Sequence, residues 1–496
     1  MPASSTSTQP ASLTTASVNE TISGIGTTPI EAALVVGALA LVSVRWLPPR
    51  FRRRVAIGAA AVSLASAAVL AVAGLRWQMI PVLVAVAVVL PFTARTMLGK
   101  PGARRTRWWL AGPGSAACVL AIVAGVGAAI AFPVPDFPTP TGKHAVGTTV
   151  IEWTDSGRRE KRTTDPDDVR ALQAQIWYPA EASPDGAERA LSMGRSEAEA
   201  NVVAEAFADY LGFPRFVLDG VVAARTNSVR DAPVASGKER FPVVLFTPGG
   251  GVGRWTNTAW AEELASHGYV VAALDHPYDT AAVMFADGRT VRRPKYPISN
   301  DGEARRLVEK LAAVRARDLS SALTHLGRLD NGEVKSILAG RLDTERAAVV
   351  GMSAGGGGAF QAARTDERFS AVLTLDGNPY DAHPGPYDQP ALALTQQMGL
   401  ADNPRYIPDL KRVLKLSTTT GYLLTIPGTA HPTFTDAPLW MPPVPSLIGT
   451  HGRTEPNRII NELTLGFLDA ELRGRPTDLP GLFSEHGELS VYDSDE

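Results

Sequence analysis

Four long apolar stretches occupy most of the first 135 residues, at about 29–44, 55–75, 78–94 and 108–132. The second, VAIGAAAVSLASAAVLAVAGL, has no charged residue over 21 positions, enough for a helix to cross a hydrocarbon core of about 30 Å. A lipid core offers the backbone no hydrogen-bonding partner, so such segments fold there as helices. Any one of them alone is compatible with a buried core helix. Four in succession predict an α-helical transmembrane region of about four helices over residues 28–135.

The charges between these stretches predict the orientation of the helices. Five arginines lie between the first and second stretches, in RWLPPRFRRR, and five basic residues between the third and fourth, in ARTMLGKPGARRTR. The link between the second and third has only Arg76. Positively charged links stay in the cytoplasm. We therefore expect a multi-pass protein of the cell membrane with everything after residue 132 on the extracytoplasmic side.

The rest of the chain has a different composition. Residues 1–135 contain eleven basic and two acidic residues, whereas the remainder contains 37 basic and 48 acidic ones. The Ser/Thr-rich segment 1–27 has no basic n-region and is expected to be a disordered tail rather than a signal peptide. A proline-rich linker is predicted at 136–145, a catalytic domain at 146–475 and an acidic tail at 476–496.

Apolar runs after the linker predict the fold of this domain. Strands are expected at 242–247, 269–274, 347–350, 371–375 and 421–426, after a hairpin formed by 147–153 and 172–178. Helices are expected at 259–267, 312–328 and 455–473. Apolar strands alternating with helices indicate an α/β domain with a mostly parallel, doubly wound sheet.

The segment RAAVVGMSAGGGGA, residues 346–359, carries the strongest functional signal. It places Gly-x-Ser-x-Gly between a strand and a small-residue helix, the context of a nucleophile elbow. Ser353 would project its Oγ above the sheet, and the N–H of Ala354 would face a developing oxyanion. Because the chain contains 45 glycines, a chance match is the alternative, and the partners of the serine decide between them.

A nucleophilic serine needs a base, and the base needs an orienting acid. Asp376 directly follows the strand 371–375, although DGNP also suits a simple turn. His431 follows the strand 421–426, where a plain surface histidine is the alternative. The chain order Ser, Asp, His is that of elbow-type hydrolases. The competing acids are Asp275 and Asp318, and the competing bases are His276, His325, His383 and His451.

A glycine-rich loop, FTPGGGVGRW at 246–255, is the candidate for the second oxyanion donor. We favour the N–H of Gly250, because its glycine neighbours let the backbone approach a ligand closely. No Lys-Ser/Thr pair follows, which excludes a P-loop. The single cysteine, Cys118, excludes an intramolecular disulfide and a cysteine metal cluster. We expect no metal, no cofactor and no nucleic-acid partner.

The blocks FPVVLFTPGGGVGRWTNTAWAEELASHGYVVAALDHP, GMSAGG, LDGNP and IPGTAHPTFTD, in this order, resemble the platelet-activating-factor acetylhydrolase family of α/β-hydrolases. That family consists of calcium-independent serine esterases and phospholipases, and the resemblance covers roughly residues 145–470. It implies Ser353 as nucleophile, His431 as base and Asp376 as orienting acid, with the backbone amides of Gly250 and Ala354 as the oxyanion hole.

The chain departs from the family pattern at two places. Met352 precedes the nucleophile where the family usually has histidine, and Pro-Gly-Gly-Gly at 248–251 replaces His-Gly-Leu-Gly. The second change removes a side chain at the pocket mouth, which bears on acyl-chain preference. The apolar segment 437–449 is expected to line an acyl pocket, to touch the bilayer, or only to cover the core.

Together these features predict a membrane-anchored serine hydrolase that cleaves carboxylic esters of lipid or phospholipid type. Its expected partners are a lipid or small ester substrate and the membrane bilayer. An acyltransferase that uses a cell-envelope acceptor would share the same acyl-enzyme. A non-enzymatic binding module tethered to the membrane is the alternative from a different class.

Overall fold

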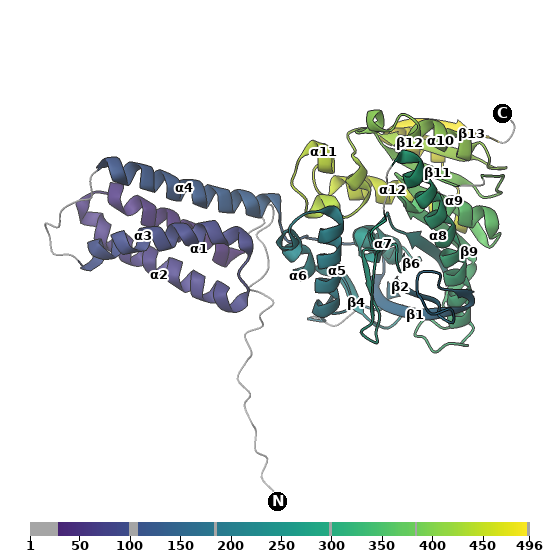
Figure 1. The fold of residues 1–496 in the computed structure, drawn as a ribbon, viewed down its shortest axis with the longest axis horizontal. Coiled ribbons are helices and arrows are strands. Elements are labelled where there is room, and N and C mark those ends of the chain that lie inside the picture. The colour runs from purple at the N-terminus through teal and green to yellow at the C-terminus, as the bar shows by residue number, and fades with distance from the viewer. Residues whose placement is uncertain (1–27, 99–107, 183–185, 297–299, 382–383, 494–496) are drawn as a thin grey trace, which may run out of the picture. The chain divides into compact units, whose positions relative to one another are not determined.

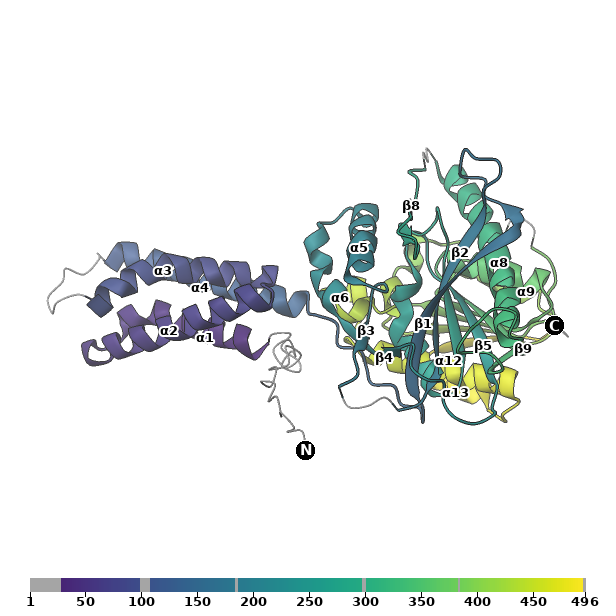
Figure 2. The same ribbon diagram turned by 90° about the horizontal axis from the view of Figure 1, so that it is seen from below.

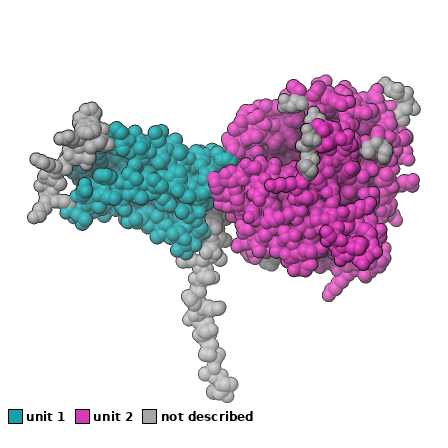
Figure 3. Space-filling model, viewed as in Figure 1, with its two compact units in different colours: residues 1–134 teal, residues 135–496 magenta. Residues whose placement is uncertain are grey.

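The computed structural model describes residues 28–98, 108–182, 186–296, 300–381 and 384–493. The chain divides into two compact units, Met1–Val134 and Pro135–Glu496, coloured separately in Figure 3. The predicted N-terminal tail, the basic link at 99–107 and His383 lie outside the described residues.

The first unit contains four helices, α1 (Pro29–Ser43), α2 (Pro49–Ala73), α3 (Ile80–Leu98) and α4 (Trp108–Ala131). Four helical segments, Pro29–Trp46, Pro49–Ala73, Trp77–Leu98 and Ala111–Ala131, are long and apolar enough to cross a membrane. The third apolar stretch, predicted to end at 94, continues as helix to Leu98. The helices contact one another through small and aliphatic side chains, among which Leu34, Ala38 and Val82 are almost fully buried.

A polar contact joins the start of α1 to the turn before α3. Thr28 caps α1 by accepting a hydrogen bond from the N–H of Glu31, and the Glu31 side chain accepts one from the N–H of Thr28. Arg76, from the link between α2 and α3, forms a 3.0 Å ion pair with the buried Glu31 carboxylate. Arg76, the one basic residue in the link between α2 and α3, thus forms its ion pair at the end of the helices where that link lies.

The second unit is built on a mostly parallel 11-stranded sheet, shown in Figures 1 and 2. In sheet order the second to seventh strands run parallel, and the first and eighth pair antiparallel with their neighbours in that group. In sheet order the strands are β13 (Glu488–Tyr492), β12 (Gly421–Ile426), β11 (Ala391–Gln396), β10 (Phe369–Leu375), β9 (Leu342–Met352), β5 (Phe241–Thr247), β6 (Val270–Asp275), β2 (Val169–Ala180), β1 (Ala145–Arg159), β4 (Arg225–Arg230) and β3 (Arg189–Leu191).

Helices cover both faces of this sheet, as predicted. Because side chains alternate along a strand, Val243 and Leu245 of β5 enter one core and Val244 and Phe246 the other. Figure 2 shows α8 and α9 on one side and α12 and α13 on the other. The first core is covered by α8 (Asp301–Asp330), α9 (Gly355–Thr365) and α10 (Tyr406–Leu414), and the second by α7 (Thr258–Ser266), α12 (Glu455–Arg473) and α13 (Leu479–His486).

The two segments predicted to flank the catalytic domain both contact it. The segment expected as an acidic tail forms α13 and β13, because Leu479 and Phe483 enter the second core and β13 pairs with β12. The segment expected as a proline-rich linker, 136–145, is hydrogen-bonded to its own unit. Asn227 donates to the carbonyl of Pro138, and the N–H of Thr141 donates to Glu263, each within 2.9 Å.

Candidate active site

The turn between β9 and α9 has the geometry of a nucleophile elbow. Ser353 has φ +53°, a left-handed conformation that is costly for a residue with a side chain. A Cβ on Gly351 would collide with the carbonyl of Gly355, and a Cβ on Gly355 would collide with that of Thr247. Glycine at both places therefore lets strand, turn and helix approach closely enough to form the strained turn.

Three side chains from three separate segments meet at this turn. The Oγ of Ser353 lies 2.9 Å from Nε2 of His431, and Nδ1 of the same imidazole lies 2.5 Å from Oδ2 of Asp376. Asp376 follows β10, and His431 begins a short 3-10 helix, η7 (His431–Phe434), that follows β12. Since parallel strands end at one edge of a sheet, residues 78 and 55 positions apart in the chain become neighbours.

The carboxylate of Asp376 is held from its other side. Its side chain is only 1% exposed, and its backbone also has a positive φ, +48°. Oδ1 accepts hydrogen bonds from the N–H of Gln396, at 3.0 Å, and from the hydroxyl of Tyr406, at 2.9 Å. Burial, followed by the nearby Asp376 carboxylate, raises the pKa of Tyr406 well above its ordinary value, so its hydroxyl remains a donor.

Tyr406 is a site residue that the sequence reasoning missed. It lies on α10, in a segment without a recognisable motif, 30 residues after Asp376. The only available signal was a tyrosine at the start of an amphipathic helix, which is commonly a core residue. The strand β11, also missed, supplies the second donor to Asp376 through the N–H of Gln396, which ends that strand.

Removing the Tyr406 hydroxyl is expected to lower kcat about tenfold without changing KM, because hydrogen bonds to charged groups contribute about 1.5–3 kcal/mol. Tyr406→Phe leaves Asp376 with one donor fewer and its carboxylate less firmly oriented. Steady-state hydrolysis of a chromogenic ester measures both constants.

Tyr387→Phe is the matched control. The Tyr387 hydroxyl is buried in the same face of the sheet and has no hydrogen-bond partner among the described residues. Its loss should leave kcat unchanged. Equal kcat values for the wild type and Tyr406→Phe would show that the tyrosine only fills space.

The two backbone amides expected to hold an oxyanion face the same region. A Cβ on Gly250 would lie 3.5 Å from the Cβ of Ala354, and a Cβ on Gly249 would lie 3.2 Å from that of Ser353. Within the described part of the chain, neither the N–H of Gly250 nor that of Ala354 donates a hydrogen bond. Both donors are therefore available to a bound ligand.

The competing acids and bases belong to other contacts. Asp275 binds Arg254, and Asp318 binds Arg170 and His276, all of them buried. His325 stacks on Trp153 with ring centroids 5.0 Å apart, and burial, with a smaller effect of Arg328, lowers the pKa of His325 to about 4. His451 contacts the carbonyl of Pro427 at 2.6 Å. Within the described residues, none of these five groups is hydrogen-bonded to the hydroxyl of Ser353, whose partner is His431.

The apolar segment 437–449 is divided between the interior and the surface. Ala437, Leu439 and Trp440 are buried, whereas Val444 is 44% exposed. The exposed part leads into a single turn of helix, α11 (Pro445–Ile448). Its role, as part of an acyl pocket, as a contact with the bilayer or as a cover of the core, stays a prediction.

Comparisons with known proteins show which family this chain resembles. The sequence model of the family described as "Platelet-activating factor acetylhydrolase, isoform II" matches residues 129–475. A platelet-activating factor acetylhydrolase from Cavia porcellus is 32% identical over 173 residues, which is 31% of this chain and 38% of the relative. A protein of Arthroderma benhamiae described as a probable 1-alkyl-2-acetylglycerophosphocholine esterase is 25% identical over 273 residues, covering 52% of this chain and 63% of the relative.

Solved structures extend the likeness to the fold. A ferulic acid esterase from Streptomyces cinnamoneus aligns with a TM-score of 0.57 and 27% identity, over 72% of this chain and 99% of that one. This confirms the predicted α/β-hydrolase fold. The chain spans 38% to 63% of the length of the two curated relatives named above. Because the family model covers well over half of the sequence, the chain belongs to the family of platelet-activating factor acetylhydrolase, isoform II.

Proposed function

We propose that this protein is a serine hydrolase that cleaves carboxylic esters, with Ser353 as nucleophile, His431 as base and Asp376 as orienting acid. One observation carries the proposal, namely the continuous hydrogen-bonded series from Ser353 Oγ through both ring nitrogens of His431 to Asp376. Such a series makes a hydroxyl nucleophilic at neutral pH. The ester-cleaving activities named for the relatives point to the same reaction class.

The geometry assigns each group a step. Nε2 of His431 takes the Ser353 proton while Oγ bonds to the ester carbonyl carbon, and the π electrons move to the carbonyl oxygen. The amides of Gly250 and Ala354 bind that oxyanion, and each such donor contributes roughly 3 kcal/mol. Collapse breaks the bond to the alcohol, which leaves with the proton from His431. Water then repeats the sequence on the acyl-enzyme and releases the acid.

The surroundings of the site favour an apolar acyl group. Tyr210, at the end of α5 (Glu197–Leu211), places its hydroxyl 3.9 Å from where a Cβ on Gly250 would lie. Tyr210 is 40% exposed, and Leu211, the next residue in the chain, is 51% exposed. Large exposed apolar side chains that adjoin a reactive centre are typical of surfaces that bind apolar ligands. We therefore propose lipid or phospholipid-type acyl esters as the substrate class.

Labelling and turnover of the purified full-length protein in detergent micelles test the proposal. A fluorophosphonate should label it covalently, and it should hydrolyse p-nitrophenyl esters and short-chain phospholipids. Acyl transfer to an added alcohol in preference to water would favour the acyltransferase alternative. The absence of both labelling and turnover would leave a membrane-tethered binding module.

We further propose that residues 28–135 anchor this hydrolase in the cell membrane. Large apolar side chains are exposed on each of the four helices, and Val36, Val72 and Leu120 are 65%, 91% and 69% exposed. Such a surface is stable in lipid and aggregates in water. In this proposal the catalytic domain begins at residue 146 and includes β13, with 136–145 as a segment docked on it.

The catalytic domain is expected on the extracytoplasmic side. The two basic links would be cytoplasmic, and an even number of spans returns the chain to the side on which it began. Protease added to intact spheroplasts should digest residues 146–492, while a tag inserted between Pro101 and Gly102 should stay protected. Protection of the hydrolase until the membrane is permeabilised would reverse this orientation.

A further inference from the structure

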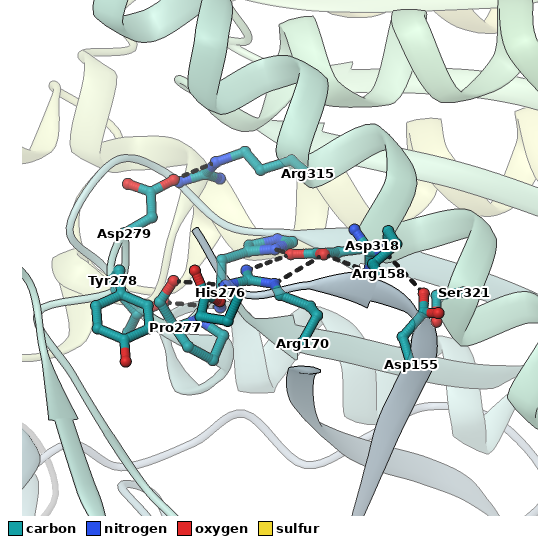
Figure 4. Close-up of polar contacts among 12 residues, drawn as sticks. Asp155, Arg158, Arg170, His276, Pro277, Tyr278, Asp279, Arg315, Asp318 and Ser321 are labelled. Atoms are coloured by element: carbon teal, nitrogen blue, oxygen red, sulfur yellow. Dashed lines mark hydrogen bonds and ion pairs between the residues drawn. The ribbon is translucent and has the colours of Figure 1, made fainter. Parts of the chain in front are cut away.

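A buried arginine lies directly behind the glycine-rich loop. Arg315, on α8, is 1% exposed, and its guanidinium donates hydrogen bonds to four protein groups. Nη2 donates to the carbonyl of Gly249 at 3.1 Å, and Nη1 donates to that of Pro248. Nε donates to Asp279 at 2.7 Å, the pair drawn in Figure 4. One guanidinium thus holds two consecutive carbonyls of the loop.

Holding the Gly249 carbonyl fixes the direction of the next amide. In a trans peptide the C=O and the N–H point in opposite directions. The N–H of Gly250 is therefore directed away from Arg315, and no acceptor in the described chain takes it up. The loop faces Ser353 and Ala354 at this point. Without the arginine, the carbonyl of Gly249 would lack this donor.

The same arginine also contacts the other half of the site. A Cβ on Gly358 of α9 would lie 2.8 Å from the Cβ of Arg315, so α9 packs directly on the stem of this side chain. A Cβ on Gly355 would lie 2.9 Å from the carbonyl of Pro248. Arg315 therefore contacts both segments that supply oxyanion donors, the loop before Gly250 and the helix that follows Ala354.

A second set of buried hydrogen bonds fixes the guanidinium. Nη1 of Arg315 donates to Thr247 Oγ1 at 3.1 Å, and this hydroxyl lies 2.9 Å from Nε2 of His276. Nδ1 of His276 lies 2.8 Å from Asp318, to which Arg170 donates (Figure 4). Burial lowers the pKa of His276, so its neutral ring accepts from Thr247 and donates to Asp318.

We infer that Arg315 is a positioning residue for the oxyanion hole, which orients the Gly249–Gly250 peptide so that the N–H of Gly250 is presented to the reacting carbonyl. The inference rests on the proposed ester hydrolysis. It assigns a role in the reaction to a side chain that does not touch the substrate. Lysine cannot replace it, since a single ammonium lacks the planar fork that reaches two carbonyls and a carboxylate together.

The test compares Arg315→Lys with the wild type, both as full-length protein, after complete titration of active sites with a fluorophosphonate. Titration removes any loss of folded protein from the comparison. We expect kcat per titrated site to fall roughly 10- to 100-fold, somewhat less than loss of an oxyanion donor itself. KM should change by less than about threefold, because the ground-state ester does not need this donor.

A transition-state analogue gives the readout that a purely structural role would not change. An alkyl trifluoromethyl ketone adds to Ser353: the Oγ–C bond forms, the carbonyl π bond becomes an oxyanion, and the proton goes to His431. The inhibition constant should rise by the same factor by which kcat falls.

Arg473→Lys is the matched control. Arg473 also donates to two consecutive carbonyls, those of His267 and Gly268, and to one carboxylate, that of Asp469. Those carbonyls precede β6 and lie at the other edge of the sheet. Its kcat per site and its inhibition constant should equal those of the wild type. Equal losses in the two lysine variants would overturn the inference.

Asp279→Asn covers the case in which Arg315→Lys does not fold. This substitution weakens the hydrogen bond that Nε of Arg315 donates and so leaves the guanidinium less firmly positioned. We expect kcat per site to fall roughly 3- to 10-fold, again with a matching change in the inhibition constant. Unchanged constants in either folded variant would overturn the inference and leave the proposed function standing. A wild-type protein that neither reacts with the fluorophosphonate nor hydrolyses esters would contradict both the inference and the proposed function.

Discussion

Replacing Ser353 with alanine is expected to lower kcat for ester hydrolysis roughly 10⁴- to 10⁶-fold and to abolish covalent labelling by a fluorophosphonate. The hydroxyl is the group that His431 Nε2 contacts at 2.9 Å, and without it no acyl-enzyme can form. Alanine keeps the same backbone, so the elbow and the fold should persist. Gel fluorescence measures the labelling, and circular dichroism with thermal unfolding measures the fold.

Ser484→Ala is the control for this experiment. Ser484 lies on α13, where its hydroxyl donates to the carbonyl of Pro480 at 2.7 Å. That variant should label and turn over at the wild-type rate. Labelling that survived Ser353→Ala would place the nucleophile on another residue, and the geometry around His431 would then need a different interpretation.

The parts of the site that the sequence predicts all come from strand ends. Ser353, Asp376 and His431 each follow an apolar run, and parallel strands bring their carboxyl ends to one edge of the sheet. Their meeting could be inferred because strand direction and chain order are both visible in the pattern. Their distances and the positive φ values of Ser353 and Asp376 depend on the turns and became visible only in the structure.

The site residues that the sequence does not predict reach the site through long-range packing. Tyr406 reaches Asp376 from α10, and Arg315 reaches the loop carbonyls from α8, 66 and 67 positions away in the chain. Neither residue lies in a motif, and a tyrosine or an arginine on a helix is commonly assigned to the surface or the core. Their roles follow from the buried acceptors to which they donate hydrogen bonds. Hydrophobic periodicity in the sequence carries no information about those contacts.

The expected tail after residue 475 differs from the structure for a related reason. The segment after residue 475 looked like a tail because acidic residues dominate its end, yet Leu479 and Phe483 are almost fully buried. Four apolar residues in β11 were missed because ALALTQ is too short to separate strand from helix by periodicity. The average composition of a segment does not reveal a few apolar residues whose burial determines how that segment folds.

Asp376→Asn is expected to lower kcat about 10⁴-fold while leaving the protein folded. The carboxylate accepts the Nδ1 proton of His431 at 2.5 Å, which leaves Nε2 free to take the proton of Ser353. An amide in its place donates to Nδ1 and favours the tautomer with the proton on Nε2, so the base is lost. Stopped-flow or single-turnover hydrolysis measures the rate, and fluorophosphonate labelling should slow by a comparable factor.

Asp275→Asn is the matched control, because Asp275 also ends a parallel strand and is buried. Its carboxylate binds Arg254 and accepts a 2.9 Å hydrogen bond from the N–H of that residue. Weakening a buried ion pair should lower the midpoint of thermal unfolding. Its kcat should stay near that of the wild type. If Asp275→Asn were the inactive variant and Asp376→Asn remained active, the acid that orients His431 would be misassigned, since only the residue contacting Nδ1 can set the tautomer.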